Sequence, residues 1–335
     1  MKKDIYIPFP DEIRTIGVPA PASAPDRKKY NASLKFVEQL GITVREGRLF
    51  KGTSPEKYFS GSVEDRVGDL NEMISDGNID MILCARGGYG SAYTLPQLDF
   101  EAWKKRKKPL LLGGYSDITA LHLAMAANHI PGGISCSMFA SLDAIRCHRA
   151  SALSMRKAIS ACLRMMPFLS LPDREEYGKT AAEENKYCIN GLSWKKMWKM
   201  RPFHKNNDDF SPVSGWLLPA NLTLLTRLTG TEYLPDFSNS LLLLEEVGEL
   251  PRKVDFSFLQ LHLAHIFQKC SGIVLGQYTN CGTSAELYRI FRRAAEMTGR
   301  PVYGFVPFGH GEHSCSLVCG EPCVIGKDGH LYLLR

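Results

Sequence analysis

The sequence lacks the long apolar run that a membrane-spanning helix requires. Its apolar runs, such as Leu241 to Leu244, are far shorter than the roughly 20 residues that cross a bilayer. Residues 1–12 carry only Lys2 and Lys3 as cations and then run into prolines and acids, so they do not resemble the apolar core of a secretory signal. These absences predict a cytoplasmic protein with no membrane partner.

Paired cysteine spacings are also missing. Ten cysteines are scattered between Cys84 and Cys323 without a C-x-x-C pair, and cysteines of cytoplasmic proteins are usually reduced and buried. Cys315, Cys319 and Cys323 recur every four residues, but a glycine and a proline between them interrupt the helix that would place them on one face. We therefore expect no bound metal.

The sequence has no signature of nucleotide or nucleic-acid binding. The formal net charge is +6, but the basic residues fall in separate short runs near residues 104–108 and 195–205. G-x-G-x-x-G and Walker-type loops are absent, and the Arg86 to Gly90 loop resembles the first only superficially. We expect no nucleic-acid partner and no cofactor.

What the chain does contain is a regular alternation of apolar strands and amphipathic helices. Its 335 residues exceed the roughly 250–300 residues of a single core, so two domains are expected. In the N-terminal half, strand patterns at 13–19, 42–44, 79–84 and 109–112 alternate with helical patterns at 26–40, 62–74, 91–103 and 117–128. This alternation predicts a Rossmann-like or flavodoxin-like parallel sheet in the α/β class.

The C-terminal part repeats the alternation after a break. Helical patterns fade between 147 and 186, and a segment rich in Trp, Lys and Asn follows at 187–210. Residues 215–228 open a second unit, with strands predicted at 240–245, 272–275 and 302–306 and helices at 256–267 and 284–297. We expect an N-terminal α/β domain over 1–150, a crossing with an insertion over 151–210, and a C-terminal α/β domain over 211–335.

Three predicted strands lead directly into polar residues of catalytic types. Residues 109–112 precede Ser116, residues 241–244 precede Glu245, and residues 302–306 precede His310. Loops at the carboxyl ends of strands are where open α/β sheets bind ligands. A serine hydroxyl needs a base, and an imidazole serves best when an acceptor fixes its tautomer. The pattern predicts Ser116 as nucleophile, His310 as general base and Glu245 as the orienting acid.

Each of these residues also has a structural interpretation. The serine segment does not match the elbow G-x-S-x-G, since residue 118 is isoleucine, and Ser116 or Asp117 could cap the next helix. Glu245 alone is typical of a solvated acid at a strand end, and His310 alone of a loop histidine. The glycines of the Arg86 to Gly90 loop either admit a substrate close to the backbone or form a tight turn.

Seven segments, taken in order, resemble motifs of the LD-carboxypeptidases, a family that includes the microcin C immunity peptidases. The similarity spans nearly the whole chain. The segments are Tyr58 to Arg66, Asp80 to Gly90, Gly114 to Thr119, Asn221 to Leu225, Leu244 to Glu246, Leu275 to Tyr278 and Phe308 to His310.

The resemblance implies a serine peptidase whose N-terminal Rossmann-like domain carries Ser116 and whose C-terminal α/β domain, of the swivelling type, carries Glu245 and His310. It places the oxyanion hole at the backbone N–H groups of Asp117 and Gly88. Members are typically homodimers without metal or organic cofactor, and they release the terminal D-alanine of murein tetrapeptide, a small muropeptide, during cell-wall recycling.

The candidate substrate-binding residues are Arg86, Gly87, Tyr115 and Asn221. A guanidinium such as that of Arg86 could bind a substrate carboxylate. The sequence departs from the family pattern in ways that affect the substrate pocket but not the triad. The departures are Pro219-Ala-Asn221, the run Arg252 to Phe256, the residues after Ser135 and a long crossing from 181 to 210.

Two alternatives stay open. One is an immunity-type peptidase that cleaves a peptidyl-adenylate antibiotic, with Trp194 or Trp198 of the insertion stacking on the base. The other is a catalytically silent muropeptide-binding protein that has kept the fold.

Overall fold

The computed structural model describes residues 5–48, 58–169, 201–203, 212–311, 313–327 and 329–333. Trp194, Trp198 and most of the expected insertion lie outside these residues. The chain divides into two compact units. Unit 1 comprises Met1–Met166 and Cys315–Val318, and unit 2 comprises Pro167–Ser314 and Cys319–Arg335. Over the described residues, no helix combines the length and apolar character needed to cross a membrane.

Unit 1 is built on a sheet with the strand order β11-β5-β4-β3-β1-β2. Its strands are β1 (Thr15–Val18), β2 (Thr43–Glu46), β3 (Met81–Leu83), β4 (Leu111–Gly114), β5 (Gly133–Ser135) and β11 (Leu317–Val318). Strands β2, β1, β3, β4 and β5 are parallel, and β11 is antiparallel to β5. The parallel order 2-1-3-4-5 is that of flavodoxin-like folds, so the predicted fold class of this domain is confirmed.

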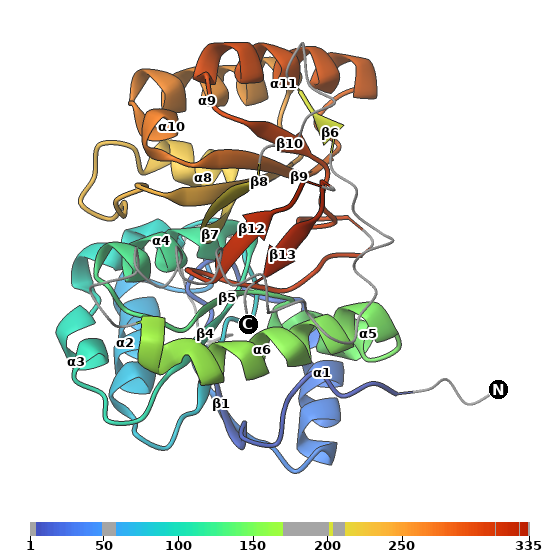
Figure 1. Cartoon of the computed structure of the whole chain (residues 1–335). Helices are drawn as coiled ribbons and strands as arrows, with labels where there is room; N and C mark the ends of the chain where they lie inside the picture. The colour runs from blue at the N-terminus through green and yellow to red at the C-terminus, as the bar shows by residue number, and fades with distance from the viewer. Residues whose placement is uncertain are drawn as a thin grey trace. The chain divides into compact units, whose positions relative to one another are not determined.

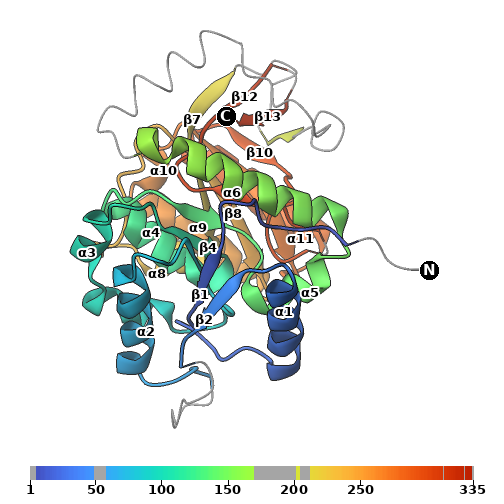
Figure 2. The ribbon, with the colours of Figure 1, turned by 90° about the horizontal axis from the view of Figure 1, so that it is seen from below.

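Helices cover both faces of the unit 1 sheet. They are α1 (Arg27–Gln39), α2 (Val63–Ser75), α3 (Phe100–Lys104), α4 (Thr119–Ala127), α5 (Leu142–Ile145) and α6 (Arg149–Leu169), with short 3₁₀ helices η1 (Ser91–Gln97), η2 (Ser116–Ile118) and η3 (Phe139–Ser141). Figures 1 and 2 show α2, α3 and α4 on one face and α1 and α5 on the other. This doubly covered sheet explains why its strands read as nearly continuous apolar runs.

Two expectations for this half need correction. The helix expected at 91–103 is split into η1 and α3, because Pro96 has no N–H to continue an α-helical ladder. The predicted fading of helical structure after 147 is wrong, since α6 runs to Leu169 and unit 1 extends to Met166. Its buried residues recur at helical spacing, as at Ala152, Met155 and Ile159, in a segment whose serines weaken the apolar pattern.

Unit 2 contains a mixed sheet with the order β13-β12-β7-β8-β9-β10-β6. Its strands are β6 (Arg201–Pro202), β7 (Val213–Asn221), β8 (Ser240–Val247), β9 (Gly272–Thr279), β10 (Val302–Gly304), β12 (Pro322–Ile325) and β13 (Leu331–Leu333), and its helices are α8 (Leu222–Arg227), α9 (Pro251–Leu263), α10 (Ile266–Lys269) and α11 (Ser284–Thr298). Strands β7 to β10 are parallel, with β8 buried between β7 and β9. Figure 1 shows α9 and α11 together on one face of this sheet. The predicted second α/β domain is confirmed.

His122 of α4 gives unit 1 a testable sensitivity to acid. Its Nε2 lies 3.1 Å from the carbonyl oxygen of Leu112, and burial lowers the pKa of His122 to about 4. The unfolded chain protonates this histidine near pH 6.5, whereas the folded protein does so only near pH 4. Between these values the unfolded state binds the extra proton, so the free energy of unfolding falls as the pH falls.

We expect His122 to remove about 2–3 kcal/mol of stability between pH 7 and pH 4.5. His122→Gln keeps an N–H for the Leu112 carbonyl but has no titrating ring. Over the same pH range its free energy of unfolding should therefore fall by about 2–3 kcal/mol less than that of wild type. Urea unfolding at both pH values measures the difference, with His148→Gln as the control at an exposed histidine. Equal losses of stability in wild type and His122→Gln would show that His122 is not the source of this pH dependence.

Candidate active site

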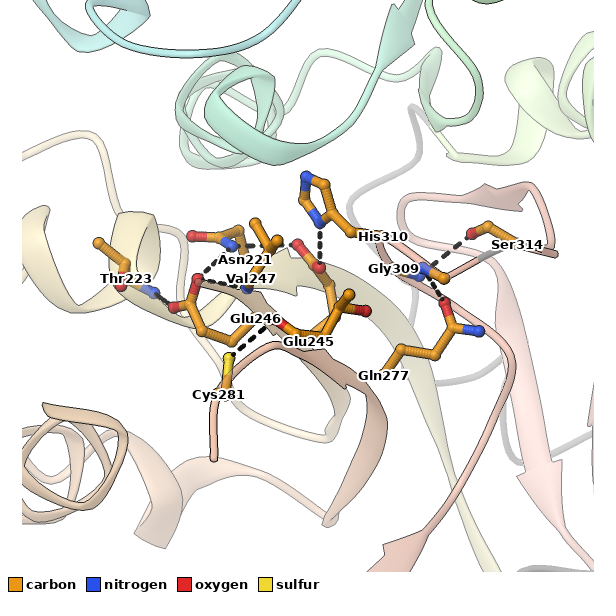
Figure 3. Close-up of polar contacts among 12 residues, drawn as sticks. Asn221, Thr223, Glu245, Glu246, Val247, Gln277, Cys281, Gly309, His310 and Ser314 are labelled. Atoms are coloured by element: carbon orange, nitrogen blue, oxygen red, sulfur yellow. Dashed lines mark hydrogen bonds and ion pairs between the residues drawn. The ribbon is translucent and has the colours of Figure 1, made fainter. Parts of the chain in front are cut away.

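Glu245 and His310 contact each other in unit 2, as Figure 3 shows. Glu245 lies near the end of β8, and His310 lies in the loop after β10. Nδ1 of His310 is 2.7 Å from Oε2 of Glu245. The Glu245 side chain is 1% exposed and that of His310 is 18% exposed, so a buried acid holds a partly accessible imidazole. The structure thus brings together two of the three predicted catalytic residues.

Asn221, the last residue of β7, links Glu245 to a second buried acid, Glu246. Its Nδ2 donates to Oε1 of Glu245 at 3.1 Å and to Oε1 of Glu246 at 3.0 Å, and its Oδ1 accepts from the backbone N–H of Leu224 at 3.1 Å. Glu246 also accepts from the backbone N–H of Thr223, at 2.9 Å. The amide of Asn221 is therefore fixed in one orientation, with its donors toward the glutamates.

The local backbone explains how two successive glutamates reach the same amide. Successive side chains of a regular strand point to opposite faces. The pairing of β8 with β9 shifts register between Leu244 and Glu246, and such irregularities redirect side chains near active sites. Gly276, opposite the shift, must be glycine, because a Cβ there would lie 2.5 Å from the carbonyl oxygen of Phe308 and 3.2 Å from the Cβ of Glu245.

The electrostatics of this pair favour one histidine tautomer. Burial raises the pKa of Glu245, while hydrogen bonds from His310 and Asn221 oppose that rise. The carboxylate is therefore best stabilised when Nδ1 of His310 carries a proton and donates it. In the neutral ring Nε2 then carries no proton, which is the form a general base needs.

Gln277 of β9 holds the loop that carries His310. Its Oε1 accepts from the backbone N–H of Gly311 at 2.8 Å, and its Nε2 donates to the carbonyl oxygen of His313 at 3.0 Å. The loop also closes on itself, since the N–H of Gly309 donates to Oγ of Ser314 at 3.1 Å (Figure 3). No role for Gln277 was predicted from the sequence, although it lies in one of the family-like segments.

Gly309 is the second position near the pair where only glycine fits. Its φ is 132°, and a Cβ there would lie 2.9 Å from Oε2 of Glu245. The backbone can therefore pass close to the carboxylate of Glu245, and the next residue, His310, lies in contact with it. This close approach explains why the middle residue of the Phe308 to His310 segment is glycine.

Ser116 lies in unit 1, where it follows β4 after a single intervening residue, Tyr115, and is the first residue of η2. Its φ is +62°, a left-handed conformation that is uncommon for residues other than glycine, asparagine and aspartate. Strained strand-to-helix turns of this kind present the nucleophile in the elbow motif. Gly114 is required here, because a Cβ would lie 2.9 Å from the side chain of Ile118. The elbow geometry thus forms although residue 118 is isoleucine.

The glycine-rich loop after β3 packs directly against the serine turn. A Cβ on Gly87 would lie 3.3 Å from the Cβ of Ser116 and 3.5 Å from the backbone nitrogen of Asp117. Gly88 has a φ of 111°, and a side chain there would overlap Ser23. The N–H of Asp117 belongs to the first turn of η2, where N–H groups lack helical partners. These features favour an anion near Ser116.

Two buried side chains hold the serine turn and the glycine-rich loop in place. Oδ2 of Asp117 accepts from the backbone N–H of Ser91 at 2.8 Å. Nη1 of Arg66, a 4% exposed residue, donates to the carbonyl oxygens of Gly90 at 2.7 Å and Pro21 at 2.8 Å. No sequence pattern assigned a role to Arg66, although it ends one of the family-like segments, and the Asp117 side chain was expected only as a possible helix cap.

The predicted substrate-binding residues differ in their surroundings. Arg86 is exposed and donates to the carbonyl oxygen of Ala24 at 3.1 Å, and Tyr115 is half-buried next to Ser116. Asn221 is 3% exposed and is engaged with the glutamates. The substrate contacts of Arg86, Gly87, Tyr115 and Asn221 stay predictions. Within the described part of the chain, no group of three or more His, Cys, Asp and Glu side chains could hold a metal ion.

Removing the Asn221 amide should destabilise unit 2. Asn221→Ala leaves two buried carboxylate oxygens without this donor and removes the cap of α8, so we expect a loss of about 2–4 kcal/mol. Urea unfolding measures it. Asn31→Ala, on the exposed face of α1, is the control and should change stability by less than about 0.5 kcal/mol. An equally small effect at Asn221 would show that the network is dispensable.

Sequence comparisons match both units to known families. Residues 16–133 match the family model of the LD-carboxypeptidase N-terminal domain, and residues 214–325 match that of the LD-carboxypeptidase C-terminal domain. The chain is 28% identical over 319 residues to a Bacillus subtilis (strain 168) protein named probable murein peptide carboxypeptidase, covering 91% of this chain and 86% of that protein. It is 25% identical over 328 residues to the Escherichia coli microcin C7 self-immunity protein MccF, covering 95% and 91%.

A solved structure shares the fold. It is that of the muramoyltetrapeptide carboxypeptidase from Oxalobacter formigenes, with a TM-score of 0.67 and 21% sequence identity. The match covers 95% of this chain and 97% of that chain.

Proposed function

This chain is a peptidase of the LD-carboxypeptidase family, and on that premise we propose that it is a serine carboxypeptidase that releases the terminal D-alanine of murein tetrapeptide. The observation that carries the proposal is the buried Glu245 in contact with Nδ1 of His310, at 2.7 Å. The names of the Bacillus and Oxalobacter relatives support the substrate class. The elbow conformation of Ser116 supports its role as nucleophile.

The proposed reaction begins with Oγ of Ser116 attacking the carbonyl carbon of the L,D-amide. Nε2 of His310 takes the hydroxyl proton, and Glu245 stabilises the resulting imidazolium. The tetrahedral oxyanion accepts hydrogen bonds from the backbone N–H groups of Asp117 and Gly88. The imidazolium then protonates the leaving amine of D-alanine, and a water activated by His310 hydrolyses the acyl-enzyme. This sequence requires Ser116 and His310 to come within direct hydrogen-bonding distance.

Mass spectrometry of a mixed muropeptide digest tests the proposal. Incubation with the protein should convert tetrapeptides to tripeptides with release of free D-alanine. A tetrapeptide that ends in L-alanine is the matched control, and it should stay intact because the reaction requires an L,D-amide. A folded protein that leaves every tetrapeptide unchanged would refute the proposal.

The similarity to the microcin C7 self-immunity protein favours a second candidate, an immunity-type serine peptidase. Its substrate would be a peptidyl adenylate, cleaved through the same three residues. Liquid chromatography of a peptidyl adenylate incubated with the protein measures release of the nucleotide part. Turnover of this compound together with inactivity on tetrapeptides would select this candidate.

A serine-directed fluorophosphonate separates both hydrolases from a silent muropeptide-binding protein. The probe should label wild type and not Ser116→Ala.

We further propose a cytoplasmic homodimer, in keeping with the family-like motifs. Light scattering coupled to size-exclusion chromatography tests the dimer, and a monomer at micromolar concentration would contradict it.

A further inference from the structure

Four aromatic rings form a contiguous cluster on the surface of unit 1. The aromatic cluster consists of Tyr58, Phe59, Tyr89 and Tyr93, whose neighbouring ring centroids are 4.6–6.1 Å apart. Tyr58 is 53% exposed, Tyr89 39% and Tyr93 55%. Large aromatic side chains usually bury most of their surface, so three exposed tyrosines joined through ring contacts of Tyr89 and Phe59 indicate a binding surface.

The aromatic cluster is held in place from beneath. The guanidinium of the buried Arg66 lies 4.6 Å from the centroid of the Phe59 ring. Oγ of Ser23 donates to the carbonyl oxygen of Tyr58 at 2.6 Å and accepts from the backbone N–H of Tyr89 at 3.2 Å, so one side chain ties two segments of the cluster together. The rings are therefore preorganised, which reduces the entropy lost on binding.

The aromatic cluster lies close to the candidate nucleophile. Tyr89 is two residues from Gly87, whose Cα lies against Ser116, and two residues span at most about 7 Å. In a muramoyl tetrapeptide, three stem residues separate the bond cut by the proposed reaction from the sugar. Extended, they span about 10–11 Å. A substrate with its scissile bond at Ser116 can thus place its sugar ring over the tyrosines.

We propose that the aromatic cluster binds the muramoyl sugar ring of the substrate. This inference rests on the proposed function. A tyrosine ring offers an apolar face to the C–H groups of a pyranose and a hydroxyl at its edge for polar substituents. The hydroxyls of Tyr89 and Tyr93 are 3.4 Å apart, so they present two hydrogen-bonding groups to one substituent. The muramoyl ring is uncharged once its lactyl carboxyl is amide-linked to the stem, which suits a surface formed by uncharged rings.

The test compares muramoyl tetrapeptide with the bare tetrapeptide. Wild type should prefer the sugar-bearing substrate about tenfold in kcat/KM, mainly through KM. In the double variant Tyr58→Ala/Tyr93→Ala, that preference should fall to about one. Tyr58→Phe/Tyr93→Phe, which keeps the rings, should retain part of it. Tyr288→Ala, at a 57% exposed tyrosine of unit 2, is the control and should leave the preference at its wild-type value.

Circular dichroism of the double variant checks that it is folded. Equal kcat/KM for the two substrates in wild type, or an undiminished preference in the folded double variant, would overturn the sugar site while leaving the proposed function intact. Inactivity of wild type on both substrates would instead refute the proposed function. Competitive inhibition by adenosine that is lost in the double variant, without a preference for the sugar, would assign the cluster to a nucleobase and overturn the inference.

Discussion

Replacing Ser116 with alanine should lower the rate of tetrapeptide hydrolysis by about 10⁴-fold to 10⁶-fold. Without Oγ no acyl-enzyme can form, and the remaining groups only bind and polarise the substrate. The loss should appear mainly in kcat, because the hydroxyl acts on the reacting carbon and not on the distant parts of the substrate. Steady-state kinetics with purified tetrapeptide measures it. Activity within tenfold of wild type would exclude Ser116 as the nucleophile.

A second variant at the same position separates chemistry from stability. Ser116 has a φ of +62°, where serine and alanine are both strained and glycine is not. Ser116→Gly should therefore be as inactive as Ser116→Ala, yet more stable by about 1 kcal/mol. Thermal unfolding of the two variants gives the comparison. A glycine variant no more stable than the alanine variant would show that the turn holds no strain.

The fold was largely predictable because the sequence patterns that mark its helices and strands involve residues close together in the chain. A strand buried in a parallel sheet reads as an apolar run, and an N-cap such as Asp26 or Ser62 marks where a helix begins. The helix α6 was missed because its apolar stripe is diluted by serines. The helix expected at 91–103 was predicted as continuous because the residues around Pro96 recur at helical spacing, and the break at this proline was missed.

The site was predictable only in part, because its supporting contacts join residues far apart in sequence. Ser116, Glu245 and His310 could be predicted as catalytic residues since each follows an apolar strand, and the structure shows the predicted contact between Glu245 and His310. Gln277 holds Gly311 from 34 residues away, and Arg66 holds Gly90 from 24 residues away. No periodicity in the sequence encodes such pairs, and the family-like segments flagged these residues without assigning them roles.

Replacing Glu245 with glutamine should lower kcat by about 10⁴-fold, although the two side chains have nearly the same shape. The reason lies in Asn221, whose Nδ2 donates to Oε1 of Glu245 while its Oδ1 is held by the N–H of Leu224. The introduced glutamine must turn its carbonyl oxygen toward Asn221, and its NH₂ then faces Nδ1 of His310. Nδ1 becomes the acceptor, so Nε2 carries the proton and cannot act as a base.

The contact between Asn221 and Glu245 predicts that the effects of substitutions at these two positions depend on each other. In Asn221→Ala/Glu245→Gln the glutamine is free to turn its oxygen toward His310 and restore the useful tautomer. The double variant should therefore be about tenfold more active than Glu245→Gln, while Asn221→Ala alone lowers activity. Kinetics of the four proteins gives the coupling, and ¹⁵N chemical shifts of the His310 ring report the tautomer directly. Multiplicative losses in the double variant would mean that Glu245 acts through its charge alone, and not by selecting which nitrogen of His310 carries the proton.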